Sequence, residues 1–222
     1  MISRHEEDWF KKFEPEKRIL TGQAYLLVKR FMDLFLVVVT LPLWLPLNGI
    51  IALLIRITSP GAPVVFRQLR TGKGGRRFNM YKFRTMVHNA EELKAVYAHL
   101  NELQLPDFKI TNDPRITPIG RFLRKTSLDE LPQLFNVLRG EMSLVGPRPT
   151  SFGPETYQLW HTERLDVMPG MTGLWQIIGR AHLEFDDRLR LDIAYIERAS
   201  IWLDINILVR TVLAVFQQRG AH

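Results

Sequence analysis

Two adjacent carboxylates, Asp129 and Glu130, lie in the stretch TSLDELPQL (residues 126–134). A basic run comes immediately before them and consists of Arg121, Arg124 and Lys125. Cations this close should lower the pKa of Asp129 and keep its carboxylate ionised. An ionised aspartate can bind Mg²⁺ or attack a phosphorus atom, while neighbouring cations hold the phosphate and neutralise charge on a leaving group.

The same residues also have a purely structural interpretation. Ser127 as an N-cap with Glu130 three residues later would form a capping box, and an acid in the first turn complements the helix dipole. The stretch SLDELPQLFNVLRG then predicts a helix that ends at Gly140. Local sequence alone favours this interpretation, which is compatible with a chemical role for Asp129.

Two later segments carry arginines in constrained or glycine-rich settings. Arg148 stands between Pro147 and Pro149, which restrict the backbone on both sides and suit the arginine to bidentate phosphate binding. The stretch PGMTGLWQIIGR ends in Arg180. A rigid surface turn is the alternative for the first segment, and a packed loop with Trp175 in the core is the alternative for the second.

The composition indicates one sizeable core and an anionic partner. The chain has 222 residues and a net charge of +7, from 30 Lys and Arg against 23 Asp and Glu. Nucleic acid, an acidic membrane surface and a phosphorylated substrate all fit this charge. Cysteine is absent, which excludes disulfides, Cys-ligated zinc and thiol nucleophiles. Between Arg56 and Ala90 there are eight Lys and Arg and no acid.

An apolar run over residues 31–55 contains one charged residue, Asp33. As one straight helix it would be about 37 Å long, enough to cross a hydrocarbon core of about 30 Å. Pro42 and Pro46 lie in its middle and disfavour a continuous helix. Both flanks are basic, whereas a span would place only one of them on the cytoplasmic side. We therefore favour a re-entrant helix-break-helix over a span.

The rest of the chain predicts short elements. Residues 63–70 and 76–84 are strand-like around the turn TGKGG, which lacks the spacing of a Walker A loop. Residues 89–104 predict a helix capped by Asn89 and Glu92, and residues 113–126 predict a turn and a short basic helix. Residues 199–216 carry an apolar stripe that suits either core packing or a membrane surface.

These patterns together predict an α+β, mainly helical fold. We expect a polar or amphipathic leader over residues 1–28, a re-entrant membrane hairpin over residues 29–58 and a cytoplasmic catalytic domain over residues 59–222. The catalytic domain would contain a small β-hairpin and amphipathic helices at the membrane surface.

From about residue 28 onward, the chain resembles the bacterial sugar transferase family, the monotopic polyprenyl-phosphate phosphoglycosyl transferases. The resemblance rests on KRFMDLF, VVFRQLRTGKGGRRFNMYKFRTM, DPRITPIGRFLRKTSLDELPQLFNVLRGEMSLVGPRP, PGMTGLWQIIGR and the closing RGA. The long central string is very specific. The chain looks like the short form of the family, or the catalytic portion of a longer member that has additional membrane helices.

The resemblance implies a reaction and its residues. A hexose-1-phosphate would move from a UDP-sugar to undecaprenyl phosphate with release of UMP, as the first membrane step of exopolysaccharide, capsule or O-antigen synthesis. Asp129 would be the nucleophile and a Mg²⁺ ligand, and Glu130 would position it. The positions that resemble phosphate-binding residues are Lys82, Arg84, Arg124, Arg148 and Arg180. Asp192 matches a further acidic position of the family.

The same resemblance implies a monotopic protein of the bacterial inner membrane, with its catalytic domain on the cytoplasmic face and a homodimer as a possible assembly. Three alternatives come from other classes. A basic scaffold protein without chemistry would also bind the membrane, and a phosphohydrolase would release free sugar phosphate. A nucleic-acid binder is disfavoured, because the sequence has no helix-turn-helix, zinc-finger or RNP pattern.

Overall fold

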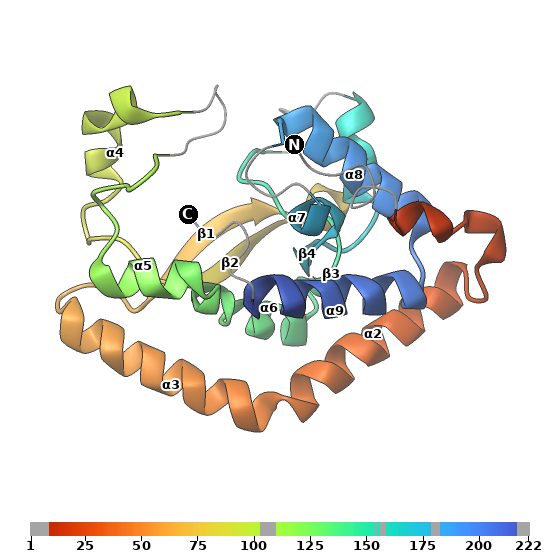
Figure 1. The fold of residues 1–222 in the computed structure, drawn as a ribbon, viewed down its shortest axis with the longest axis horizontal. Coiled ribbons are helices and arrows are strands. Elements are labelled where there is room, and N and C mark those ends of the chain that lie inside the picture. The colour runs from red at the N-terminus through yellow and green to blue at the C-terminus, as the bar shows by residue number, and fades with distance from the viewer. Residues whose placement is uncertain (1–8, 103–109, 154, 156–158, 179–182, 217–222) are drawn as a thin grey trace.

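The computed structural model describes residues 9–102, 110–153, 155, 159–178 and 183–216. Over these residues the protein is mainly helical, with two small two-stranded sheets (Figure 1). The predicted mainly helical α+β class is therefore confirmed. In Figure 1 the helices α5, α6 and α9 form a row across the molecule, and a V made of α2 and α3 lies below this row.

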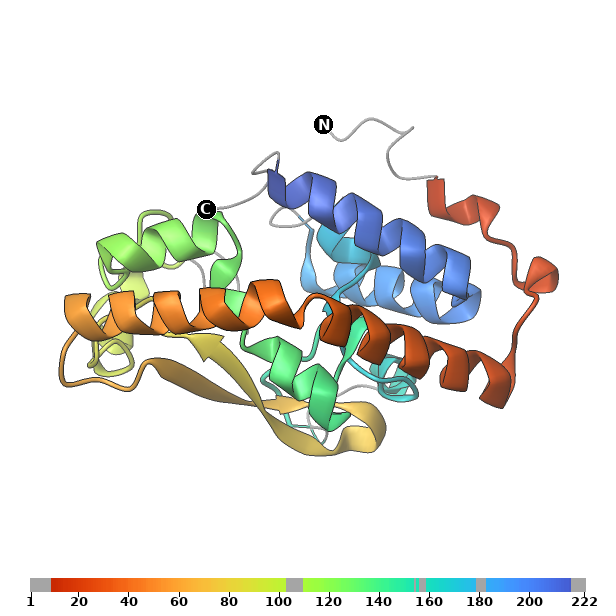
Figure 2. The same ribbon diagram turned by 90° about the horizontal axis from the view of Figure 1, so that it is seen from below.

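The V consists of α2 (Gly22–Val39) and α3 (Leu41–Thr58), which meet at Thr40. Seen from the side of the V, the two helices run end to end across the molecule (Figure 2). The break comes directly before Pro42, which lies in the first turn of α3 and has no N–H for the carbonyl of Val38. Pro46 lies inside α3 without interrupting it. The prediction of a proline break was thus right near Pro42 and wrong for Pro46.

Trp44 secures the junction of the two helices. Its indole Nε1 donates to the carbonyl oxygen of Val37 at 2.9 Å, so a backbone acceptor at the end of α2 stays bonded. Its ring packs edge-on against Phe135 of α6 (Gln133–Arg139), with 5.2 Å between centroids. From the other side, Arg30 of α2 donates to the last carbonyls of α6, at 2.7 Å to Val137. The V is therefore docked onto α6.

A buried polar cluster joins α2 to the end of the chain. Asp204 of α9 (Ile201–Phe216) is fully buried and accepts hydrogen bonds from Tyr25 at 3.0 Å and Lys29 at 2.9 Å. Tyr195 of α8 (Phe185–Arg198) donates to the same carboxylate at 2.7 Å. Because every donor is directed at one carboxylate, the register of α2 against α8 and α9 is fixed.

Within the predicted polar or amphipathic leader, the described residues include apolar side chains that pack into the core. The 3-10 helix η1 (Trp9–Lys12) places Phe10 in the core, where it packs near Leu203 and Ile207. The guanidinium carbon of Arg210 lies 4.2 Å from the centroid of the Trp9 ring. This segment therefore covers the inner face of α9.

Strands β1 (Val65–Thr71) and β2 (Arg77–Phe83) form the predicted hairpin, with antiparallel pairing from Val65 opposite Phe83 to Thr71 opposite Arg77. Asn136 of α6 binds the other edge of β2. Its side chain accepts from the Tyr81 N–H at 3.1 Å and donates to the Asn79 carbonyl at 2.8 Å. An amide side chain thus takes the place of a third strand and holds β2 beside α6.

Strands β3 (Ser143–Val145) and β4 (Gly170–Thr172) pair in parallel and bring two glycine-rich motifs together. A Cβ at Gly146 would lie 2.5 Å from the carbonyl oxygen of Met168, and one at Gly170 would lie 2.1 Å from the backbone N of Gly146. Only glycine allows this backbone contact. The loop that carries Arg148 therefore rests directly on the PGMTG segment.

The remaining elements complete the predicted set with some corrections. The predicted helix over residues 89–104 is only α4 (Glu92–Val96) followed by a 3-10 turn, and Asn89 does not cap it; residues 103–104 lie outside the described residues. The short basic helix is confirmed as α5 (Pro118–Lys125). The other short elements are η2 (Pro15–Lys17), η3 (Lys73–Gly75), η4 (Ala98–Leu100), η5 (Leu128–Glu130), η7 (Leu159–Leu165) and α7 (Leu174–Ile178).

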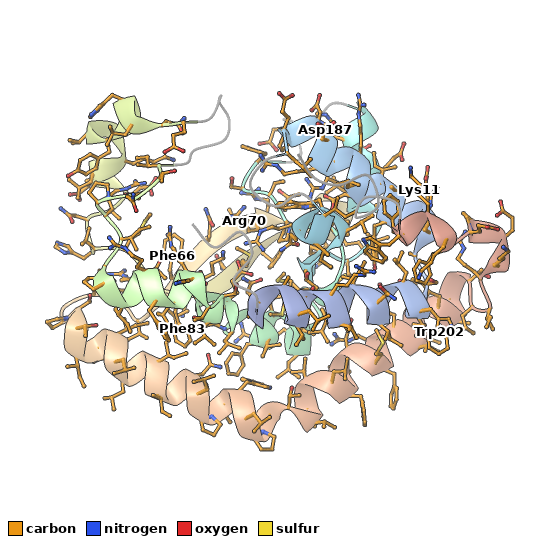
Figure 3. The ribbon with its side chains drawn as sticks, in the orientation of Figure 1. Lys11, Phe66, Arg70, Phe83, Asp187 and Trp202 are labelled. Carbon is orange, nitrogen blue, oxygen red and sulfur yellow. The ribbon has the colours of Figure 1, made fainter. Side chains whose placement is uncertain are left out.

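Large apolar side chains cover the outer faces of the V and of α9. Helix α3 is long and apolar enough to cross a membrane. Phe31, Leu43 and Ile57 are 67–75% exposed. On α9, the core interpretation of the terminal stripe is wrong for three residues that are exposed, namely Ile205, Val209 and Val212. Trp202, the largest exposed side chain of α9, lies near the arm of α2 in Figure 3.

Candidate active site

The two carboxylates follow a sharp backbone reversal rather than a helix cap. Helix α5 ends at Lys125, and Ser127 adopts the left-handed conformation with φ of 57°. Its side chain forms no capping hydrogen bond, and the regular helix α6 begins only after Pro132. The predicted capping box is therefore wrong, although the predicted end at Gly140 is confirmed by its left-handed φ of 76°. A non-glycine residue with such a backbone is typical of functional sites.

Glycine lets α5 approach β2 closely enough to orient Arg124. A Cβ at Gly120 would lie only 2.0 Å from the carbonyl oxygen of Thr85. The Nε of Arg124 then donates to the hydroxyl of Thr85 at 2.9 Å. The rest of the Arg124 guanidinium remains available to an anion that lies beside Asp129. The charge of the Asp129 carboxylate interacts with this guanidinium.

Glu130 is held between two cations. Its Oε1 lies 2.8 Å from the Nζ of Lys82 and 2.5 Å from an Nη of Arg148, and its Oε2 lies 3.3 Å from the second Nη of Arg148. Burial alone would raise the pKa of Glu130, but Arg148 and Lys82 outweigh burial and hold this pKa well below its usual range. Glu130 is therefore a fixed anion that positions both cations.

Asp129 is nine-tenths buried, and its carboxylate forms no hydrogen bond with any residue that the structure describes. Burial raises its pKa, Glu130 acts in the same direction, and the opposing cations are Lys82, Arg124 and Arg148. The predicted lowering of this pKa is therefore wrong in direction, because desolvation outweighs the cations. The result is an uncommitted carboxylate with three cations around it.

The other predicted site residues lie at different distances from this centre. Arg84 directly follows the end of β2, two positions after Lys82, and one of its Nη atoms is buried without a hydrogen-bond partner in the described structure. Asp192 of α8 is buried and forms an ion pair with Arg164 at 2.8 Å. Arg180 lies outside the described residues.

Asp192 belongs to the surroundings of Arg148. Arg164 donates a hydrogen bond to the carbonyl oxygen of Arg148 while it pairs with Asp192. Burial raises the pKa of Asp192 to about 7, against the effect of Arg164. Asp192 is thus linked to the carboxylate centre through the loop that carries Arg148, and it forms no hydrogen bond with Asp129 in the part of the chain that the structure describes.

Sequence reasoning missed Gln133, which lies one helical turn after Asp129. It is fully buried, and neither its amide oxygen nor its amide nitrogen has a hydrogen-bond partner in the described structure. A buried amide without partners costs free energy, so Gln133 is a polar group that the described contacts leave unsatisfied four positions after Asp129. The available signal was a glutamine in the apolar stretch that follows the carboxylates.

The donor set fits a magnesium ion better than a structural metal. Among the described residues no three His, Asp or Glu side chains gather into a metal cluster. Protein-bound Mg²⁺ usually takes one or two carboxylates and completes its shell with water and substrate phosphates. Asp129 could supply such a ligand, whereas both oxygens of Glu130 are engaged by cations. This arrangement suits an anionic, phosphorylated ligand.

The family of this chain follows from comparison with known proteins. The family model described as bacterial sugar transferase matches residues 24–218. The chain belongs to the bacterial sugar transferase family. The carboxylate centre, the β-hairpin, α3 and all of α2 except its first two residues lie within the matched residues.

Three relatives illustrate the similarity. The chain is 44% identical over 208 residues to an undecaprenyl-phosphate galactose phosphotransferase of Salmonella typhimurium, covering 91% of this chain and 43% of that protein. It is 42% identical over 224 residues to the galactosyl transferase CpsE of Streptococcus agalactiae, covering 93% and 49%. It is 38% identical over 215 residues to the exopolysaccharide production protein ExoY of Rhizobium meliloti, covering 95% of each. The chain thus spans less than half of the first two relatives and nearly all of ExoY.

Proposed function

We propose that this chain is a phosphoglycosyl transferase that moves a hexose-1-phosphate from a UDP-sugar to undecaprenyl phosphate. One observation carries the proposal: a buried, uncommitted Asp129 lies among Lys82, Arg124 and Arg148, beside a Glu130 that is already neutralised. The names of two relatives, undecaprenyl-phosphate galactose phosphotransferase and undecaprenyl-phosphate glucose phosphotransferase, support this acceptor and a hexose phosphate as the group that is transferred.

In the first step, an oxygen of Asp129 attacks the phosphorus that bears the sugar. A bond forms between this oxygen and phosphorus, the phosphoanhydride bond breaks, and UMP leaves with the bonding electrons. Arg124, Arg148 and Lys82 offset the negative charge on the transferring phosphoryl group and on the leaving phosphate. Glu130 keeps Lys82 and Arg148 in place for this role.

In the second step, a phosphate oxygen of undecaprenyl phosphate attacks the same phosphorus. The bond to Asp129 breaks, the carboxylate is restored, and the product is a lipid diphosphate sugar. Splitting the transfer in this way lets one cationic site handle two anions in turn. A Mg²⁺ ion held by Asp129 and the donor phosphates would supply further charge neutralisation at the leaving group.

The exposed apolar surface supports a position at the membrane. The V of α2 and α3 would enter the cytoplasmic leaflet of the bacterial inner membrane and return, with α9 lying at the surface. Apolar side chains cover the outer faces of these helices, and patches of this kind mark membrane contacts. Asp129 and Glu130 lie in η5, which connects α5 to α6, and these two helices belong to the row directly above the V (Figure 1).

The decisive experiment measures UMP release from a panel of UDP-sugars with undecaprenyl phosphate in liposomes. We expect Asp129→Asn to lower turnover at least about 10³-fold, since the nucleophile is removed. Asp166→Asn, which changes an exposed aspartate elsewhere, is the matched control and should keep full activity. Mass spectrometry after UDP-sugar alone should find a hexose-phosphate adduct on Asp129.

Undiminished turnover by Asp129→Asn, or an adduct on another residue, would refute the assignment of the nucleophile. Free sugar phosphate released without lipid would contradict a transferase and indicate a hydrolase.

A further inference from the structure

A cavity of about 150 Å³ lies next to the carboxylate centre. The loop from Arg148 to Phe152 forms one side of it, and Arg70 of β1 adjoins this loop. Trp175 of α7 and residues of α8 form the other side. Arg148 therefore belongs to both places, because it lines the cavity and also binds Glu130.

Flat rings and guanidinium groups dominate the lining. Phe152 and Phe185 form an edge-on pair with 5.7 Å between ring centroids, and the guanidinium carbon of Arg188 lies 5.5 Å from the centroid of the Trp175 ring. Four arginines line the cavity, namely Arg70, Arg148, Arg164 and Arg188. Aromatic faces stack on nucleobases, and guanidinium groups bind phosphates through paired hydrogen bonds.

The cavity lies on the side of the molecule that faces away from the V. Figure 1 shows α7 and α8 above the row of α5, α6 and α9, whereas α2 and α3 lie below it. Figure 3 shows Arg70 above the same row. With the membrane on the side of the V, as proposed above, a lipid tail would approach from that side, which favours a water-soluble occupant for this cavity.

We propose that this cavity binds the pyrimidine nucleoside end of the donor, with its diphosphate directed to Arg148 and onward to Asp129. This inference rests on the proposed function and adds the location of the leaving nucleotide. The base packs against Trp175 and the Phe152–Phe185 pair. A volume of about 150 Å³ is below the roughly 300 Å³ of pockets that enclose a whole ligand, which matches a site for one ring of an extended molecule.

The lining is less suited to the sugar. Hexose hydroxyls are usually bound by carboxylates and amides with free acceptor atoms. Among the described residues that line the cavity, Asp192 is the one carboxylate, and it is already paired with Arg164. A strongly cationic and aromatic surface instead matches a nucleotide, which combines a flat ring with negative charge.

The test compares Trp175→Ala with wild type in two measurements. The first is calorimetric binding of UMP and, separately, of hexose-1-phosphate to the Asp129→Asn background, in which no turnover occurs. We expect Trp175→Ala to weaken UMP binding about 10-fold or more, the loss expected for one stacked base, and to leave hexose-1-phosphate binding unchanged. The second is steady-state kinetics, in which KM should rise for the UDP-sugar and stay within about twofold for undecaprenyl phosphate.

Two further variants control for folding. Trp175→Phe keeps an aromatic face and should retain most of the UMP affinity, whereas Trp175→Leu keeps apolar volume and should lose it as Trp175→Ala does. Tyr97→Ala, which removes an aromatic ring next to α4, should behave as wild type. If Trp175→Ala fails to fold, the contrast between the Phe and Leu variants decides the question.

Unchanged UMP binding in Trp175→Leu would overturn the proposal, and so would a selective loss of hexose-1-phosphate binding or a selective rise in KM for the lipid. If wild type turns over UDP-sugars while the affinity for UMP is unchanged in the Trp175 variants, only the assignment of the cavity fails. If wild type binds UMP through Trp175 but releases none from any UDP-sugar, the proposed function fails and the cavity assignment stands.

Discussion

The pKa values of the two neighbouring carboxylates are shifted in opposite directions, although both lie in the same basic surroundings. Glu130 contacts Lys82 and Arg148 directly, and these cations hold its pKa well below the usual range although burial acts the other way. Asp129 is buried without a hydrogen bond to the described residues, and its pKa is raised. One carboxylate therefore holds two cations in place, while the other is left without a hydrogen-bond partner among the described residues.

This difference predicts opposite effects of two isosteric substitutions on stability. Glu130→Gln leaves Lys82 and Arg148 without their shared anion and should lower the free energy of unfolding by about 1–3 kcal/mol. Asp129→Asn removes a buried charge beside Glu130 and should leave stability unchanged or raise it. Thermal unfolding in detergent without magnesium checks both variants. Equal destabilisation by the two would contradict the assigned roles.

Asp192 predicts a pH dependence of stability. Its pKa is about 7 in the folded protein and 3.8 as the ordinary value, because burial disfavours the charged form. Because the folded protein holds the proton of Asp192 more tightly than the unfolded chain does, the free energy of unfolding is highest below about pH 4. It falls as the pH rises to about 7. Asp192→Asn lacks this loss, so its stability relative to wild type should increase across that window. A difference that is flat with pH would show that Asp192 is ionised throughout.

At the scale of elements, close backbone contacts rather than side-chain capping position the site. The reversal at Ser127 turns η5 away from the end of α5, and Gly120 allows α5 to touch Thr85. On the other side, Gly146 and Gly170 bring the loop of Arg148 against β4. The contact at Gly120 fixes Arg124 relative to Asp129, and the contact between Gly146 and Gly170 fixes Arg148. Small shifts of the backbone at these glycines should therefore move the cations of the site.

Gly120→Ala tests this at one contact. Its Cβ would lie 2.0 Å from the Thr85 carbonyl, so α5 must move, at a cost of about 1–3 kcal/mol in stability. Movement of α5 also breaks the contact between Arg124 and Thr85, so turnover should fall by more than the stability loss explains. Gly49→Ala in α3 is the matched control, because nothing lies within 4 Å of its added Cβ. Similar activity in both variants would contradict the role of the contact.

At the scale of the molecule, contacts along both arms dock the V. Trp44 near its apex packs against Phe135 of α6, Arg30 of α2 donates to the last carbonyls of α6, and Lys29 binds the buried carboxylate of Asp204. In α3, Ile51 and Ile55 pack in one cluster with Phe83 and Leu123. Each arm has 18 residues and is about 27 Å long. Because the arms diverge from an apex, the exposed apolar side chains lie along the outer side of the V (Figure 3).

The position of the break predicts different effects of its two prolines. Pro42→Ala restores the donor that a continuous helix needs and should convert part of the molecules to a spanning topology. Pro46→Ala should not, because α3 is already helical there. The chain has no cysteine, so Lys12→Cys and Lys94→Cys each introduce a single exposed thiol. Labelling of intact cells with an impermeant maleimide then shows on which side of the membrane each thiol lies. Protection of both in wild type is expected, and an accessible thiol on one side would contradict the re-entrant arrangement.

Local patterns in the sequence were sufficient for much of this protein. The period-two strands around TGKGG, the proline next to the helix break, the basic helix before Ser127 and the glycine at the end of α6 all depend on neighbouring residues. Their conformations are set by backbone sterics and local hydrogen bonds, so residue types at short spacing predict them. The motif around Asp129 was likewise sufficient to name the family.

The tertiary structure alone decided how these pieces act together. Lys82 and Glu130 are far apart in sequence, and so are Arg70 and Trp175, yet each pair shares one site. The capping box failed because packing placed Ser127 in a left-handed turn, and the pKa of Asp129 moved upward because the fold removed it from water. Burial and long-range contact are properties of the packed chain, and no short stretch of residues contains them.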